Sequence, residues 1–148
     1  MIHAQTLQFQ NAYVPVSTTG DVLSAAIDTA GCAYVTIIVA FGVIHASGPM
    51  TALSLTEATT SGGTYSAVAN SDITDAVVGT AALPAADDDD KLFVFEIEVA
   101  KLTKRFVKVN LSAHASNASL VQMTAIKSRL AEVADTAAGR GAEAIVRI

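Results

Sequence analysis

The sequence predicts an all-β fold: an antiparallel β-sandwich, jelly-roll-like, built as one domain with a short C-terminal helix or arm. Three observations carry this prediction. Residues 92–99 and 106–111 alternate apolar and polar side chains with the period of a half-buried strand. Residues 34–44 form a run rich in β-branched side chains. Clusters of Gly, Pro, Ser and Thr interrupt the strand patterns at short intervals, which is typical of sandwiches.

The segments with a strand pattern account for seven or eight strands in a chain of 148 residues, a length that suits one domain with a substantial core. The expected strands are residues 22–27, 34–44, 50–57, 65–68, 92–99, 106–111 and 119–126. Residues 1–10 and 130–148 are expected to form arms at the two ends of the domain.

The longest apolar run, residues 34–44, predicts a strand that is buried on both faces in the middle of a sheet. Gly48 and Pro49 break the run, and residues 50–57 then alternate, with Leu53 and Leu55 on one face. These two segments are expected to be antiparallel neighbours.

The two alternating segments in the second half predict inward and outward faces directly. In residues 92–99, Phe93, Phe95 and Ile97 lie opposite Val94, Glu96 and Glu98. In residues 106–111, every second side chain, from Val107 to Leu111, is expected to face inward. Residues 101–105 are then expected to form a basic hairpin connection between the two strands.

The C-terminal part changes period. Ile126, Leu130, Val133 and Ala137 recur at helical spacing, and Gly139 stands where a helix would end. We therefore expect a short helix over residues 127–138, or an irregular segment that packs on the sandwich, followed by a strand or extended arm over residues 142–148.

Charge is distributed in two blocks. Residues 1–90 hold nine acids and no Lys or Arg, for a net charge of −9, and residues 91–148 hold nine cations and five acids, for +4. Such a chain can attract copies of itself or an oppositely charged neighbour, and its first part offers no cation to a phosphate. Only 16% of residues are charged, so the surface is expected to face another protein over much of its area.

No residue pattern predicts catalysis, a metal or a cofactor. The three histidines lie far apart in the chain, and Cys32 has neither a His nor an acid at a recognisable spacing. The single cysteine excludes an internal disulfide, no secretory signal is visible, and the longest apolar run is well short of the roughly 20 residues that a membrane helix needs. A non-enzymatic protein in solution is the expectation.

Two charged clusters are the candidate interaction residues. Asp87, Asp88, Asp89 and Asp90 could bind a hard cation, but consecutive carboxylates do not converge on one ion, so a solvated acidic loop is favoured. If the loop has a role, we expect it to contact the basic segment of an adjacent subunit.

The basic candidates are Lys101, Lys104 and Arg105, with Lys108 beyond them. Nucleic-acid binding normally adds aromatic side chains or a broad basic face, and only Phe106 is near, so no nucleic acid is expected as a partner. An acidic protein surface is favoured instead.

The order of segments resembles small virion proteins of tailed bacteriophages. The resemblance covers roughly residues 22–129: IDTAG at 27–31 before the long apolar strand, LSLTE at 53–57 before a Ser/Gly/Thr turn, an acidic loop, and KRFVKV at 104–109. Residues 130–148 extend beyond the usual ending of such proteins. The resemblance implies a capsid decoration (cement) protein that binds the outside of the head and stabilises the shell.

The expected partners are accordingly the major capsid protein and further copies of the chain, with no membrane, in a virion assembled in the cytoplasm of a bacterial host. Because extended arms bridge neighbours without disturbing a core, we expect contacts from both arms, with Leu130, Val133 and Ile145 in the C-terminal one. Two alternatives stay open: a head-tail connector or tail protein, and a carbohydrate- or host-binding module, although exposed aromatics are few and Trp is absent.

Overall fold

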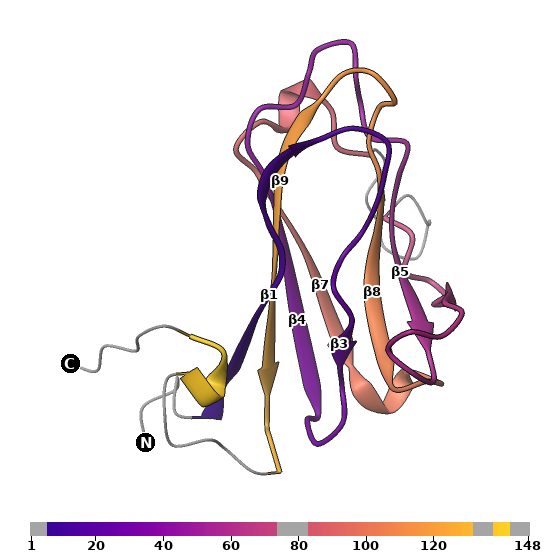
Figure 1. Cartoon of the computed structure of the whole chain (residues 1–148), viewed down its shortest axis with the longest axis vertical. Coiled ribbons are helices and arrows are strands. Elements are labelled where there is room, and N and C mark those ends of the chain that lie inside the picture. The colour runs from indigo at the N-terminus through magenta and orange to yellow at the C-terminus, as the bar shows by residue number, and fades with distance from the viewer. Residues whose placement is uncertain (1–5, 74–82, 132–137, 143–148) are drawn as a thin grey trace, which may run out of the picture.

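The computed structural model describes residues 6–73, 83–131 and 138–142, and shows two antiparallel β-sheets packed face to face as a β-sandwich (Figure 1). The four-stranded sheet has the order β1 (Gln8–Thr18), β9 (Ser119–Ser128), β4 (Tyr34–Phe41) and β7 (Leu92–Glu98). The five-stranded sheet has the order β2 (Asp21–Leu23), β8 (Phe106–Ser112), β5 (Ala52–Ala58) and β6 (Ser66–Ala67), with β3 (Ile27–Asp28) also paired to β8. Short 3₁₀ turns are η2 (Ala86–Asp88), η3 (Val99–Lys101) and η4 (Ala138–Arg140).

The core lies between the two sheets and is made by every second residue of the central strands. Val35, Ile37 and Val39 of β4 have no exposed surface, and neither do Val107 and Val109 of β8. Leu53 and Leu55 of β5 are buried as well, and Phe93 and Phe95 of β7 pack against the same cluster. The predicted inward faces of β5, β7 and β8 are therefore confirmed.

Strand pairing is nested along the chain. The outermost pair is β1 with β9, inside it β2 and β3 pair with β8, then β4 with β7, and innermost β5 with β6. Two further pairings, β4 with β9 and β5 with β8, complete the two sheets. Because consecutive strands mostly lie in different sheets, the chain crosses from one sheet to the other at most of its connections (Figure 1).

Two sequence predictions about neighbours are wrong. Residues 34–44 and 50–57 are not paired, since β4 lies in the four-stranded sheet and β5 in the other. Residues 101–105 do not form a hairpin, because β7 and β8 also lie in different sheets. Both predictions assumed that consecutive strands pair.

The prediction that residues 34–44 are buried on both faces is also wrong. The second face of β4, from Thr36 to Ala40, is only half-buried, because no further layer of the described chain covers it.

The N-terminal segment contributes a strand that the sequence pattern did not predict. Strand β1 carries Pro15 and two shifts of register against β9, and its last part is mostly exposed, so it lacks a clean alternation. Residues 8–10 belong to this strand, which shortens the expected N-terminal arm; residues 1–5 lie outside the described part.

The expected helix over residues 127–138 does not begin where the spacing placed it. Lys127 and Ser128 are the last residues of β9, and Arg129 has φ of 50°, which is not helical. Residues 132–137 and 143–148 lie outside the described residues, and with them the predicted interaction residues Val133 and Ile145. The third one, Leu130, is half-buried and packs against the core.

Candidate interaction surfaces

The four aspartates lie in the turn that leads into β7, and the three with recorded contacts have separate roles. Asp88 ends η2, accepts a hydrogen bond from the Ala85 N–H at 3.2 Å, and forms an ion pair with Lys91 at 3.0 Å. The Lys91 ammonium, as hydrogen-bond donor, holds the pKa of the Asp88 carboxyl below its usual value. Asp89 accepts a hydrogen bond from the Ile44 N–H at 2.6 Å.

Asp90 completes the turn with φ of 59°, and its N–H donates to the Gly42 carbonyl at 3.3 Å. Asp87 is exposed. The carboxylates of Asp88 and Asp89 are thus engaged with different segments. Within the described residues, no three His, Cys, Asp or Glu side chains come together as a set of metal ligands.

The basic loop at residues 102–105 is anchored by a carboxylate of the five-stranded sheet. Glu57, on β5, is only 5% exposed. It accepts hydrogen bonds from the Thr103 N–H at 3.0 Å, from the Lys104 N–H at 3.1 Å and from the Thr103 hydroxyl. A buried carboxylate of this kind needs several donors to replace its lost hydration, and here the loop backbone supplies two of them.

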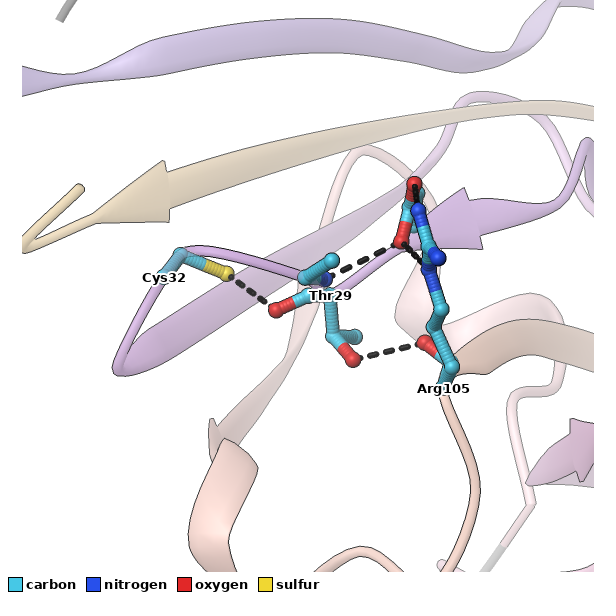
Figure 2. Close-up of polar contacts among 5 residues, drawn as sticks. Thr29, Cys32 and Arg105 are labelled. Atoms are coloured by element: carbon cyan, nitrogen blue, oxygen red, sulfur yellow. Dashed lines mark hydrogen bonds and ion pairs between the residues drawn. The ribbon is translucent and has the colours of Figure 1, made fainter. Parts of the chain in front are cut away.

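Arg105 and Asp28 join the same loop to β3 (Figure 2). The guanidinium Nε and Nη2 each donate to one carboxylate oxygen at 2.7 Å, which is the bidentate geometry. This hydrogen-bonded pairing lowers the pKa of Asp28 from 3.8 to about 2. Figure 2 also shows the Thr29 hydroxyl donating to the Arg105 carbonyl at 2.6 Å and the Cys32 thiol donating to the Thr29 carbonyl at 3.2 Å.

The other cations of this region also have partners. Lys101 forms an ion pair with Glu98 at 3.0 Å, and Lys104 donates to the Ser66 hydroxyl at 2.6 Å. The Lys108 ammonium lies 4.4 Å from the centre of the Tyr65 ring. The predicted basic cluster is therefore brought together, but much of its charge is already engaged within the chain.

The acidic and basic clusters lie at opposite ends of the sandwich, which we call the acidic end and the basic end (Figure 1). The aspartates contact Gly42 and Ile44, which follow β4, whereas Arg105 contacts Asp28 and Thr29, which precede β4. The eight residues of β4 separate the ends by roughly 26 Å. Only the aspartate run and the basic loop are separated in this way, because Asp28 and Glu57 of the acidic block contact the basic loop. The aspartate run can reach the basic loop only in another copy.

Exposed apolar side chains gather on the four-stranded sheet toward its acidic end. Val43, Leu92, Val94 and Leu120 are 66%, 62%, 51% and 43% exposed, and we call them the apolar strip. Register places them together: Leu92 is paired with Ala40, and the Leu120 N–H donates to the Val43 carbonyl at 3.0 Å. A contiguous group of this kind on a folded surface is typical of a protein interface.

Cys32, His45 and His114 each make a hydrogen bond to a backbone group nearby in the sequence. Burial raises the pKa of the Cys32 thiol, which keeps it protonated and weakly nucleophilic. His45 Nδ1 accepts from the Ser47 N–H at 3.1 Å, and His114 Nδ1 accepts from the Ser116 N–H at 3.2 Å. Each of these contacts stabilises a turn.

Comparison with the models of known protein families finds no match, and comparison with curated proteins finds no relative. In the part of the chain that the structure describes, no helix has the length and apolar character needed to cross a membrane. The function is therefore inferred from the fold and its surfaces.

Proposed function

We propose that the protein is a non-enzymatic structural component of a tailed-phage virion, a capsid decoration protein that binds the outer surface of the head. The observation that carries this proposal is the apolar strip, which lies on a sheet face that the described residues leave uncovered, in a protein with few charges. The segment order that resembles small virion proteins adds the phage context.

The finer fold assignment that accompanies this proposal is a jelly roll. A jelly roll consists of four nested antiparallel strand pairs, with neighbouring pairs placed in different sheets. The strand pairs of this chain follow that order when β2 and β3 are counted as two pieces of one strand. Jelly rolls occur in viral capsid domains and in lectins, so the fold is compatible with a virion role without specifying it.

The mechanism we propose is burial combined with avidity. Each copy covers part of a junction between shell subunits with a modest apolar contact, and many copies together oppose the separation of those subunits. The acidic end would orient the copy toward a basic region of the shell, because surface charge steers encounter more than it adds affinity.

The test is the copy number of the protein in purified phage particles, measured by quantitative mass spectrometry against the major capsid protein. The first Lys or Arg is Lys91, so trypsin yields no short peptide from the first 90 residues, and a second protease is needed for them. Abundance near that of the capsid protein supports decoration. A few copies per particle would indicate a connector or tail protein, and absence would refute the virion role.

A second candidate, carbohydrate binding, rests on one depression of about 400 Å³ on the four-stranded sheet. Tyr34, Glu96, Glu98 and Ser128 contribute to its lining, which combines an aromatic ring with polar groups. However, the Arg129 guanidinium lies over the Tyr34 ring, 5.4 Å from its centre, and so covers one of the two ring faces on which a sugar could stack. Binding on a glycan array that is lost in Tyr34→Ala would favour this candidate.

A further inference from the structure

Strand β7 forms one edge of the four-stranded sheet. Among the described residues its only partner strand is β4. Every second residue of β7 therefore directs its backbone N–H and C=O groups away from β4, where no described strand accepts them. The strand has no proline, and Leu92 and Val94 are more than half exposed. Natural edge strands are usually blocked by proline, lysine or a bulge, and none of these interrupts β7.

A groove of about 470 Å³ runs beside this edge, between β7 and the segment that follows β6. Its apolar lining includes Phe95 and Ile97 from β7, Leu55 and Val68 from the five-stranded sheet side, and Leu102. An unpaired edge next to an apolar groove is the arrangement that accepts an added strand, because the backbone supplies hydrogen bonds and the groove accepts alternate side chains.

Glu96 supplies a charge at this edge. It is exposed, and no ion pair or side-chain hydrogen bond is recorded for it within the described residues. Its neighbour Glu98 is already paired with Lys101. An added strand with a suitably placed cation would therefore find one free carboxylate.

Gly141, close to the end of the described chain, lies level with Glu96 on the opposite edge of the sheet. Gly141 has φ of 78° and lies so close to β1 that a Cβ there would be 1.5 Å from the Phe9 carbonyl oxygen. Phe9 pairs with Ile126, Ile126 with Thr36, and Thr36 with Glu96, which places Gly141 and Glu96 on one row across the four strands.

Residues 143–148, EAIVRI, have the composition of a strand to add there. Alternation separates Ala144, Val146 and Ile148 from Glu143, Ile145 and Arg147. With the first set toward the groove, Arg147 lies on the same face as Glu96.

We propose that residues 143–148 of one copy add to the free edge of β7 in a neighbouring copy, with Arg147 paired to Glu96. The segment cannot do this in its own chain. Six residues reach about 20 Å, and crossing three strand spacings uses about 14 Å of that, which leaves too little length to pair along β7. The contact is head-to-tail, so it closes a ring or extends a row of copies.

The experiment is sedimentation velocity over a concentration series on the full chain and on a chain ending at Ala142. We expect the full chain to associate and the shortened chain to remain monomeric with unchanged circular dichroism and melting temperature. Amide hydrogen exchange of residues 92–98 should be slower in the full chain at high concentration only, since the added strand protects the β7 edge.

Charge reversal tests the pairing itself. Arg147→Glu and Glu96→Arg should each raise the dissociation constant about 3- to 10-fold, and the double variant should recover most of the loss. Asp21→Arg, the same reversal at an exposed acid of β2 in the other sheet, is the matched control and should leave association unchanged. A full chain that is monomeric throughout, a shortened chain that still associates, or a double variant without recovery would each overturn the proposal. The outcome is independent of whether phage particles contain the protein.

Discussion

Replacing Glu57 by Ala removes the carboxylate that anchors the basic loop. Three hydrogen bonds to a charged acceptor are lost, two of them from backbone N–H groups. Such bonds contribute about 1.5–3 kcal/mol each, but Thr103 is exposed, so water replaces part of the loss. We expect the free energy of unfolding to fall by about 2–4 kcal/mol, equivalent to roughly 5–15 °C in melting temperature.

The assay is urea unfolding at pH 7 followed by circular dichroism, with amide exchange of residues 99–105 as a local readout. Glu96→Ala is the matched control, since it removes an exposed glutamate from β7 in the other sheet, and it should change the stability of the monomer by less than about 0.5 kcal/mol. If Glu57→Ala and Glu96→Ala unfold at the same urea concentration and the loop exchanges at the same rate, the anchoring role is wrong.

Three further predictions follow from the core, one ion pair and one turn. Leu53→Ala removes a fully buried side chain and should cost about 2–5 kcal/mol in urea unfolding, whereas Leu92→Ala, at an exposed position, should cost almost nothing. Asp28 has its pKa lowered to about 2 by Arg105, so its contribution is present above pH 3.8 and is lost as pH falls toward 2. Both side chains are more than a third exposed, so Asp28→Asn should flatten that acid dependence by at most about 1 kcal/mol. Gly141→Ala should detach η4 from β1 and speed amide exchange there without global unfolding, because the added Cβ would overlap the backbone of Phe9.

Which segments form strands, and which of their side chains face inward, could be predicted where apolar and polar residues alternate along the chain. Val107, Val109 and Leu111 alternate with polar neighbours, and all three are buried. Strand β1 could not be predicted in the same way, because Pro15 and two register shifts disrupt its period.

The candidate surfaces were only partly accessible from the sequence. The aspartate run and the basic cluster are visible as charge, but Glu57 carries no signal in its own segment that would mark it as an anchor. Its donors lie 46 and 47 residues away, and only the fold brings them within reach. The apolar strip likewise combines Val43, Leu92 and Leu120, which come from three separate segments.

The sequence by itself determined that the chain is a β-sandwich, which side chains of its alternating strands face inward, and that its charge falls into two blocks. These are properties of neighbouring residues, set by the period of a strand and by composition. Tertiary structure alone decided that β4 pairs with β7 and β9 rather than β5, that the aspartate run and the basic loop lie at opposite ends, and that the described residues leave one edge of β7 without a partner strand. Those outcomes depend on which distant strands bury the most apolar surface together, a property of the whole chain that no local pattern contains.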